Sequence, residues 1–381
     1  MRDEEKSEMK SVRLHASRAR QLHRSRGAGS RIEGRFETQA RETWDDGWAR
    51  DEEPLPPNAP VRSTLETTVT DERARSIIAS NESPDIPFDR SINPYRGCEH
   101  GCSYCYARQT HAYLELSPGL DFETKLFAKR NAAELLKEEL AKPAYRPQPI
   151  AFGTNTDAYQ PIERRYRIMR ELLEVLAACE HPLTIVTKSA LVERDLDLLA
   201  PMAARNLVKV FVSVNTLDHE LSKRLEPRAA SPKRRIATLR ALAQAGVPCG
   251  VMVAPMIPAL TDKSIEEVLA AAAAAGASMA GYIMLRLPFE VKPLFKEWLA
   301  THYPLRAEHV MSVVRDVRGG RENDPNFTTR MTGGGNYAQI VNQRFAVACR
   351  KHGLNEERRA QGDLDCTRFR PPAAGRQMRL F

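Results

Sequence analysis

The sequence lacks long apolar stretches and is poor in cysteine. No run of eighteen apolar residues occurs among its 381 residues, and its first residues are charged. A membrane-spanning helix needs about 20 apolar residues and a secretory signal needs an apolar core, so neither is expected. Seven cysteines are too few for a disulfide framework in a chain of this length. We therefore expect a cytoplasmic protein with reduced thiols and no membrane partner.

Three of the seven cysteines stand together in one short segment. Cys98, Cys102 and Cys105 have the spacing C-x3-C-x2-C, with Gly97 and Gly101 placed where the backbone must fold back. Iron–sulfur clusters are held by cysteine thiolates, and clusters that only carry electrons are normally held at all four positions. Three thiolates in one loop therefore predict a [4Fe–4S] cluster with one iron open to another ligand. Tyr104, next to the last cysteine, is expected to form an apolar side of the cluster site.

A structural zinc site and ordinary packed cysteines are the alternatives. Zinc sites of this type usually pair two short Cys/His units, but the next cysteine in the chain is Cys179. We interpret Cys179, Cys249 and Cys349 as small packed apolar residues, and Cys366 as a free thiol in a polar segment. The sequence therefore favours a cluster over zinc.

Composition divides the chain into four parts. Residues 1–60 contain few aliphatic residues, a basic stretch, an acidic stretch and a proline-rich end, which predicts a disordered tail and linker. Residues 61–300 are expected to form the core domain and residues 301–360 a helical extension. Residues 361–381, rich in arginine, proline and glycine, are expected to be a flexible tail.

Strands and helices alternate regularly through the core. Apolar segments bounded by turn residues predict parallel strands, and amphipathic segments between them predict crossover helices. We expect strands at 91–94, 150–153, 183–187, 208–214, 250–255 and 280–285, with helices at 131–140, 164–178, 195–204, 232–245 and 264–275. Further helices are expected at 291–300, 306–315 and 340–349. The fold class is α/β, a partial (β/α)6 TIM-like barrel; a complete eight-unit barrel is the alternative.

The cysteine loop resembles that of the radical S-adenosylmethionine (SAM) superfamily. The segments Thr-Lys-Ser at 187–189, Ser-Val-Asn-Thr at 213–216 and Glu-Pro-Arg at 226–228 resemble its spore photoproduct lyase-like branch. The runs 88–108, 117–125 and 156–163 are similar to a family of bacterial radical SAM proteins without an established substrate. The resemblance covers about residues 60–355. The lyase has a hydrogen-donating cysteine where this chain has Gly-Thr-Asn-Thr at 153–156, which puts thymine-dimer reversal in doubt.

The resemblance implies an enzyme with a [4Fe–4S] cluster and SAM as cofactors. Cys98, Cys102 and Cys105 would hold the cluster, and SAM would chelate the open iron. An electron from reduced flavodoxin or ferredoxin would cleave SAM to methionine and a 5′-deoxyadenosyl radical, which abstracts hydrogen from an unknown substrate, in one hypothesis a nucleic acid. The alternative is a non-catalytic zinc- or iron–sulfur-containing protein that binds nucleic acid.

Functional groups of parallel barrels gather at the C-terminal ends of the strands. Reading those ends together with the resemblance assigns contacts to SAM and leaves the catalytic residues unknown. Thr154, Asn155 and Asp157 are expected near its amino group, Lys188 at its carboxylate, Ser213 and Asn215 at the ribose, Met252 at the adenine, and Tyr104 at the cluster. Capping of the next helix is the alternative for the residues at 154–157. Arg286 follows the last strand and is expected to face the substrate.

Two features suggest partners. The net charge is +8, and basic groups at 164–167 and 224–235 begin helices that follow strand ends, which favours a phosphate-bearing substrate; solvated helix faces are the alternative. The last five residues, Gln377–Phe381, resemble the Gln-Leu-x-Leu-Phe peptide with which bacterial repair and replication proteins bind the DNA sliding clamp. A chance match, or a tail that folds back on the barrel, is the alternative.

Overall fold

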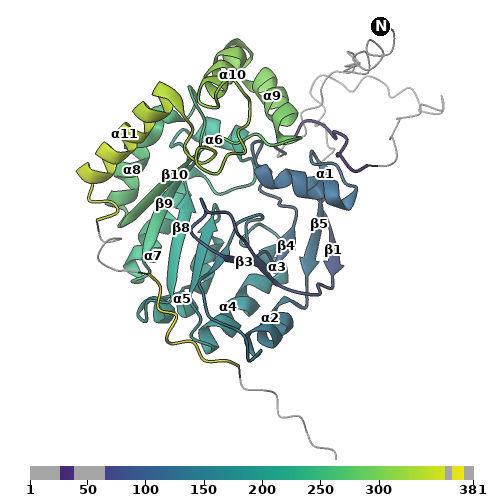
Figure 1. The fold of residues 1–381 in the computed structure, drawn as a ribbon, viewed down its shortest axis with the longest axis vertical. Coiled ribbons are helices and arrows are strands. Elements are labelled where there is room, and N and C mark those ends of the chain that lie inside the picture. Colours follow the sequence, from purple (N-terminus) through teal and green to yellow (C-terminus); the bar gives the residue numbers. More distant parts are fainter. Residues whose placement is uncertain (1–25, 38–64, 357–362, 373–381) are drawn as a thin grey trace, which may run out of the picture.

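A sheet with six parallel strands forms the centre of the molecule (Figure 1). The structure, a computed structural model, describes residues 26–37, 65–356 and 363–372. Strand order in the sheet is β10-β9-β8-β7-β6-β3-β2, parallel from β3 to β10. The strands are β2 (Ile78–Ser80), β3 (Arg90–Ile92), β6 (Ile150–Phe152), β7 (Leu183–Thr187), β8 (Val208–Ser213), β9 (Cys249–Met256) and β10 (Met279–Met284). The predicted partial (β/α)6 barrel is confirmed, and β2 adds an antiparallel edge strand.

Helices that connect the strands cover one face of the sheet. In β9, Val251 and Val253 are fully buried, whereas Met252 and Ala254 are half-buried. Alternate residues of a strand point to opposite faces, so the valines face the helices and Met252 faces the barrel interior. The crossover helices are α2 (Ala132–Leu140), α4 (Ile168–Ala178), α5 (Leu196–Ala203), α7 (Pro232–Gln244) and α8 (Ile265–Ala274).

The helix predicted at 164–178 is broken. It consists of α3 (Glu163–Tyr166) and α4, separated by Arg167, whose φ is 56°. The carboxylate of Glu163 explains the break, since it accepts hydrogen bonds from the backbone nitrogens of Met169 (3.1 Å) and Arg170 (3.3 Å). A side chain thus satisfies donors at the start of α4 that a continuous helix would satisfy with its own carbonyls.

A second, smaller sheet was not predicted. It has the order β1-β5-β4, formed by β1 (Thr68–Glu72), β5 (Lys125–Lys129) and β4 (Tyr95–Arg96). β5 is preceded by α1 (Asp121–Thr124), and β4 leads directly into the cysteine loop. These strands are short and carry charged residues at their ends, so the sequence offers little apolar periodicity from which to predict them.

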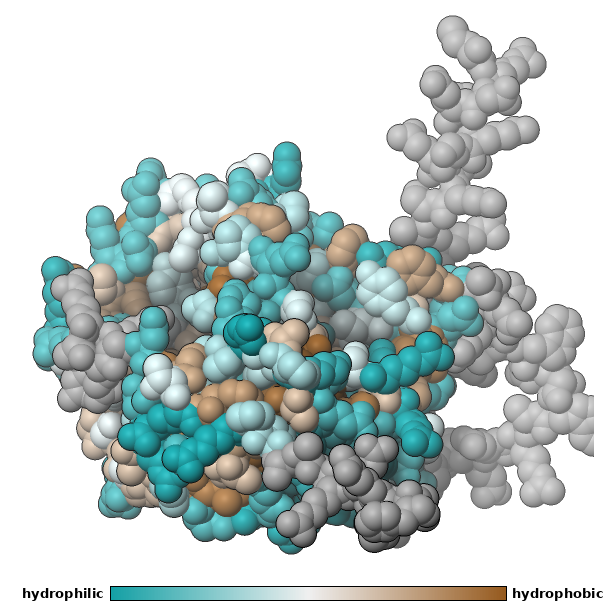
Figure 2. Space-filling view, turned by 60° about the horizontal axis from the view of Figure 1, so that its bottom comes forward, coloured by the Kyte–Doolittle hydropathy of each residue, from teal (hydrophilic) through white to brown (hydrophobic). Residues whose placement is uncertain are grey.

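The C-terminal helices lie at one end and along one edge of the barrel (Figure 1). They are α9 (Val291–His302), α10 (Ala307–Asp316) and α11 (Gly335–Lys351), and α6 (His219–Leu225) lies close to the first two. Within the described ranges, no helix combines the length and apolar character needed to cross a membrane. Figure 2 shows a face on which hydrophilic side chains predominate and hydrophobic ones are scattered, as is ordinary for a protein surface.

Part of the predicted N-terminal tail is ordered. Residues 26–37, here called the strap, run across the cysteine loop, α1 and α9, which contradicts the prediction that all of residues 1–60 are disordered. The buried Glu123 carboxylate accepts hydrogen bonds from the backbone nitrogens of Gly27 (3.0 Å) and Ala28 (2.8 Å). A Cβ on Gly27 would lie 1.5 Å from the carbonyl oxygen of Gly101, so only glycine fits there.

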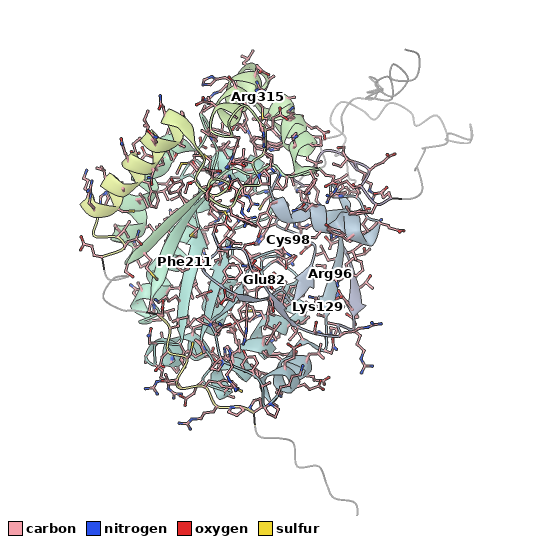
Figure 3. The ribbon with its side chains drawn as sticks, viewed as in Figure 1. Glu82, Arg96, Cys98, Lys129, Phe211 and Arg315 are labelled. Atoms are coloured by element: carbon pink, nitrogen blue, oxygen red, sulfur yellow. The ribbon has the colours of Figure 1, made fainter. Side chains whose placement is uncertain are left out.

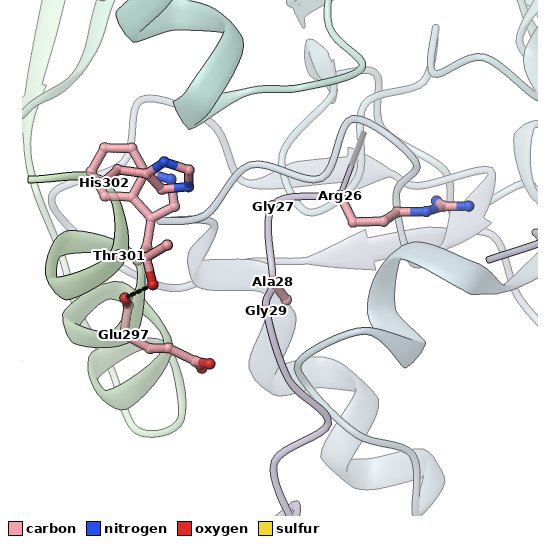
Figure 4. Close-up of a pocket in the computed structure, with 8 residues that line it drawn as sticks. Arg26, Gly27, Ala28, Gly29, Glu297, Thr301 and His302 are labelled. Atoms are coloured by element: carbon pink, nitrogen blue, oxygen red, sulfur yellow. Dashed lines mark hydrogen bonds between the residues drawn. The ribbon is translucent and has the colours of Figure 1, made fainter. Parts of the chain in front are cut away.

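A small cavity lies between the strap and α9 (Figure 4). Its volume is about 20 Å³, which suits a single water molecule rather than a substrate. The lining residues are Arg26, Gly27, Ala28, Gly29, Glu297, Trp298, Thr301 and His302. Nearby, the Ser30 hydroxyl donates a hydrogen bond to Glu297 (2.6 Å). The strap is therefore packed against the domain by polar contacts that composition alone does not reveal.

The predicted C-terminal tail is also partly ordered. Phe369 packs against Tyr145 and His181, with ring centroids 5.4 and 5.3 Å apart, and the backbone nitrogen of Arg370 donates to the Cys179 carbonyl (2.8 Å). Residues 363–372 are thus held on the barrel, contrary to the prediction for 361–381. The clamp-like peptide Gln377–Phe381 lies outside the described residues.

Candidate active site

The cysteine loop lies at the C-terminal end of β3, near the centre of the molecule, where Figure 3 labels Cys98. Gly97 and Gly101 have φ angles of 73° and 66°, in the left-handed region that favours glycine. The backbone nitrogen of Cys98 donates to the carbonyl of Phe122 (2.9 Å), which ties the loop to α1. The predicted fold-back of the chain at both glycines is confirmed.

The three cysteine thiols lie close enough to influence one another. Cys98 and Cys102 are buried and Cys105 is half-buried. Burial raises the pKa of the Cys98 thiol well above its ordinary value, and Asp157 and the two other cysteines act in the same direction. Burial likewise raises the pKa of Cys102 to about 12. Two buried thiols whose charged form is disfavoured, beside a third cysteine, suit a site where iron cations replace the protons.

No three His, Cys, Asp or Glu side chains in the described part of the chain converge as ligands of one metal ion do. The thiolates of a [4Fe–4S] cluster bind different iron atoms, so they need not meet at one point. The loop glycines, the buried thiols and their mutual electrostatic influence therefore fit a cluster. The residues that would hold it are Cys98, Cys102 and Cys105.

A buried carboxylate, that of Glu226, holds several side chains together beside Cys102. Glu226 accepts hydrogen bonds from the Tyr104 hydroxyl and the Arg235 guanidinium, and from the amide nitrogen of Asn215 (3.3 Å). Both Glu226 and Arg235 are almost fully buried, with side chains 0% and 1% exposed. Burial opposes ionisation of Glu226, but Arg235 and Lys188 outweigh it and hold the pKa of this carboxyl below its ordinary value.

The ammonium group of Lys188 lies near the same side chains. Its ammonium lies 6.0 Å from the centre of the Tyr104 ring. Burial opposes its charge, yet the nearby Cys102 and Glu226 raise the pKa of Lys188 above its ordinary value. None of the described residues is recorded as a hydrogen-bond partner of its ammonium group, so this cation beside Cys102 is free to bind an anionic ligand.

Asp157 lies beside the cysteines, but its oxygens are already used. The carboxylate accepts hydrogen bonds from the Thr187 hydroxyl (2.7 Å) and the backbone nitrogen of Lys188 (2.7 Å), and His100 Nδ1 lies 3.3 Å away. The backbone nitrogen of Tyr159 donates as well (2.9 Å). In this geometry Asp157 connects the ends of β6 and β7 with the cysteine loop, a positioning role that fits it better than direct contact with SAM.

Thr154 and Asn155 surround Asn93, the residue that follows β3. The Asn93 side-chain oxygen accepts from the Thr154 hydroxyl (3.3 Å) and the backbone nitrogen of Asn155 (3.0 Å). The Tyr106 hydroxyl donates to the carbonyl of Thr154, which brings this segment next to Cys105. Asn155 itself is exposed. Of the two, Thr154 lies nearer to the cysteine loop.

Ser213 and Asn215 lie at the end of β8, on the Glu226 side of the site. The Ser213 carbonyl accepts a hydrogen bond from Arg235 (2.9 Å), and Ser213 pairs in register with Met252 of β9. The side-chain oxygen of Asn215 is buried and has no hydrogen-bond partner in the described structure. A buried acceptor of this kind is costly unless a ligand donates to it. The contact of Asn215 to a ribose hydroxyl stays a prediction.

Three of the basic residues predicted to attract phosphate are paired with carboxylates within the protein. Arg228 bonds to Glu99 (3.0 Å) and Arg234 to Glu193 (2.6 Å). Arg235 is the buried partner of Glu226. A cation that is paired with a carboxylate attracts an external anion weakly, so these three arginines do not support the predicted phosphate-binding face.

Sequence reasoning missed the residues that fix the loop from outside it. The Arg108 guanidinium bonds to the Cys102 carbonyl (3.0 Å) and to Glu123, and Glu123 in turn holds the strap. Gln160 bonds to the carbonyl of Gly97 (3.0 Å) and accepts from the backbone nitrogen of Glu99 (2.9 Å). The sequence around these residues does not predict the contacts, because those of Glu123 and Gln160 join segments that lie far apart in the chain.

His111 makes this region sensitive to acid. Its Nε2 lies 2.9 Å from the Lys125 carbonyl, so Nε2 carries the hydrogen, while Nδ1 is buried without a partner in the described structure. Burial lowers the pKa of His111 to about 4. In the unfolded chain the value is about 6.5, so the unfolded state takes up the proton first and stability falls as the pH drops from 6.5 toward 4.

We expect this one group to reduce the free energy of unfolding by about 2 kcal/mol between pH 8 and pH 5. His111→Gln retains a donor for the Lys125 carbonyl but does not titrate, so its unfolding free energy should depend less on pH. Denaturant unfolding at a series of pH values measures the difference. His219→Gln, at a side chain 65% exposed, is the control and should keep the wild-type slope. Equal slopes for wild type and His111→Gln would show that His111 is not responsible.

Comparison with known proteins agrees with the geometry. A family model described as Radical SAM superfamily matches residues 92–272, which include the cysteine loop and the strands β6 to β9. The uncharacterized protein Rv2578c of Mycobacterium tuberculosis is 42% identical over 231 residues, covering 59% of this chain and 68% of the relative. The uncharacterized protein MJ0683 of Methanocaldococcus jannaschii is 31% identical over 171 residues, covering 45% of this chain and 61% of the relative.

Among solved structures, spore photoproduct lyase has a similar fold. One mutant of that lyase aligns with a TM-score of 0.52 and 18% identity, covering 76% of this chain and 82% of the lyase. Another, with bound AdoMet and dinucleoside spore photoproduct, aligns with a TM-score of 0.51 and 19% identity over the same shares. At this identity the likeness concerns the arrangement of helices and strands.

Proposed function

Because the chain belongs to the radical SAM superfamily, we propose that it cleaves SAM reductively and directs the resulting radical at a substrate. Membership of this superfamily implies two cofactors, a [4Fe–4S] cluster and SAM. It also implies an enzyme that uses radical chemistry. The proposal adds which residues of this chain hold these cofactors. It also adds that hydrogen abstraction from a substrate is the step the site serves.

One observation carries the proposal. Three cysteine thiols occupy one loop at the end of β3, and the unpaired ammonium of Lys188 lies beside them. When bound, the cluster supplies one electron that splits SAM into methionine and a 5′-deoxyadenosyl radical. Lys188 is proposed to bind the SAM carboxylate, because a cation beside an open cluster position orients a chelating amino acid.

The chain's other residues keep this arrangement fixed and dry. Tyr104 is buried over the loop, and its hydroxyl is held by Glu226. Asn215 is proposed to accept from a ribose hydroxyl through its buried, unpartnered oxygen, and Met252 to contact the adenine from the neighbouring strand. Apolar and hydrogen-bonded surroundings exclude water, which would otherwise reach a reactive intermediate.

The electron donor is proposed to be a reduced flavodoxin or ferredoxin. The substrate is proposed to be related to nucleic acid, a choice supported by the net charge of +8. At the position of Gly153–Thr156 the chain lacks the cysteine that the resemblance would require for dimer reversal by the lyase route. The reaction on the substrate is therefore proposed to differ from that of the lyase.

The test is release of 5′-deoxyadenosine. Anaerobically reconstituted protein, given SAM and dithionite, should release 5′-deoxyadenosine and methionine in equal amounts, detected by chromatography. Protein that holds iron but releases neither product would contradict the proposal. Stoichiometric zinc without iron in anaerobically purified protein would instead favour the alternative, a zinc-containing protein that binds nucleic acid.

A further inference from the structure

Arg286 is a cation beside the candidate active site that has no anionic partner in the described structure. It follows β10, the last strand of the barrel, and its guanidinium lies 5.6 Å from the centre of the Tyr106 ring, next to Cys105. Its Nε is buried and makes no hydrogen bond to any described residue. Its other nitrogens make one hydrogen-bond contact within the described part of the chain, a weak one from Nη1 to the sulfur of Met331 (3.8 Å).

Asp85, the carboxylate whose charge acts on Arg286, is already used. Asp85 receives two hydrogen bonds of 2.5 Å from Arg330, which occupy both of its oxygens. Among the residues that the structure describes, the positive charge of Arg286 is therefore not balanced by a direct anionic partner.

Burial makes an unpaired guanidinium costly at Arg286. Burial lowers the pKa of the Arg286 guanidinium, and the neighbouring Arg330 acts in the same direction. A half-buried guanidinium with an unpaired donor carries a desolvation cost that a hydrogen-bonded anion would offset. Stacking over the Tyr106 ring recovers only part of it, since exposed cation–π contacts contribute little.

The strand end holds Arg286 in place. The buried Arg318 donates to the carbonyls of Met284 (3.1 Å) and Leu285 (2.6 Å), and the Leu285 nitrogen donates to the Met256 carbonyl (2.9 Å). Leu285 and Leu287 are buried in an apolar cluster with Cys102 and Tyr104. Because alternate residues of an extended segment point in opposite directions, Arg286 is turned away from that cluster and toward Tyr106.

We propose that Arg286 binds an oxyanion of the substrate, a phosphate or a carboxylate, at the open edge of the barrel beside Tyr106. The planar guanidinium presents paired donors that match such a group. That the anion belongs to the substrate rests on the proposed function, in which Lys188 already binds the SAM carboxylate. The site thus restricts substrates to those with an anionic group close to the reacting carbon.

The test measures anion binding directly. Inorganic phosphate and acetate are titrated, in separate arms, into anaerobic cluster-loaded protein saturated with SAM, and binding is followed by the NMR linewidth of each anion. Wild type should bind one of them, and Arg286→Gln should weaken that binding roughly 10-fold or more. Arg286→Lys, which keeps the charge but loses the planar pair of donors, should fall between the two. A preference for phosphate or for acetate shows whether the oxyanion of the substrate is a phosphate or a carboxylate.

Arg321→Gln is the matched control, because Arg321 is an exposed arginine near the same edge and its loss removes the same charge. It should change anion binding less than twofold. Equal binding by wild type and Arg286→Gln, or no binding of either anion by wild type, would overturn the proposal. The same titration without SAM is the comparison, and anion binding that appears only without SAM would also overturn the proposal, since Arg286 would then hold the SAM carboxylate.

Iron content of every variant shows that the site is intact, and SAM cleavage by the wild type is measured in the same preparations. Anion binding through Arg286 without release of 5′-deoxyadenosine would leave the anion site standing and refute the proposed function. Release of 5′-deoxyadenosine with no anion binding through Arg286 would refute only the anion site.

Discussion

Replacing Cys98 with alanine is expected to abolish cluster binding and SAM cleavage together. The thiol is buried and its residue is tied to α1 through the backbone, so Cys98 has a fixed position in the loop. Outer contacts to a metal are worth 10–100-fold in affinity or activity, and loss of a direct ligand should cost at least as much. Iron content and 5′-deoxyadenosine release after anaerobic reconstitution measure the effect. Cys102→Ala and Cys105→Ala should behave in the same way.

Cys349→Ala is the matched control for these variants. Cys349 is also buried, but it lies in α11 and packs in the main apolar core, away from the cysteine loop. This variant should retain iron and activity within about twofold of wild type, with only the small stability loss of a shortened core side chain. If Cys98→Ala kept full iron content, or if Cys349→Ala lost it, the assignment of the ligands would be wrong.

Glu226→Gln is expected to destabilise the barrel strongly. The change removes the charge that balances the buried Arg235, and it leaves the Tyr104 hydroxyl with a weaker acceptor. Breaking one partner of a buried ion pair typically costs about 3–5 kcal/mol, because the other charge stays uncompensated. Denaturant unfolding of the cluster-free protein under reducing conditions gives the free energy of unfolding directly.

Glu193→Gln provides the comparison, since it breaks the more exposed pair between Glu193 and Arg234. Such pairs contribute about 0–1 kcal/mol, so this variant should unfold close to wild type. The double variant Glu226→Gln with Arg235→Met should recover part of the loss, because it removes the orphaned charge as well. Similar losses for Glu226→Gln and Glu193→Gln would show that the buried pair is not the support that the geometry indicates.

The parts of the fold that depend on local patterns were predictable. The strands β6 to β10 are largely apolar runs, and both faces of such a strand are covered in an α/β domain, so they could be placed within a few residues. The cysteine spacing predicted the loop because all its determinants lie within a few residues of one another. Lys188 could be placed beside the loop because it closes an apolar strand at the end where barrel sites form.

The parts that depend on distant contacts were not predictable. The strap looks like a disordered tail in composition, yet Glu123, almost a hundred residues away, binds the backbone of Gly27 and Ala28. Arg235 looks like part of a solvent-facing basic stretch, but the fold places it in the interior beside Glu226. Composition gives the number of charges in a segment, but only the structure shows which carboxylate pairs with each cation.

Electron paramagnetic resonance of the dithionite-reduced protein, recorded with and without SAM, tests the central claim most directly. If Cys98, Cys102 and Cys105 hold a [4Fe–4S] cluster with one iron open, the reduced protein should give the signal of a reduced cluster. Addition of SAM should shift that signal, because SAM binds the open iron. A cluster signal that SAM leaves unchanged, or a protein that carries zinc and gives no signal, would contradict the account.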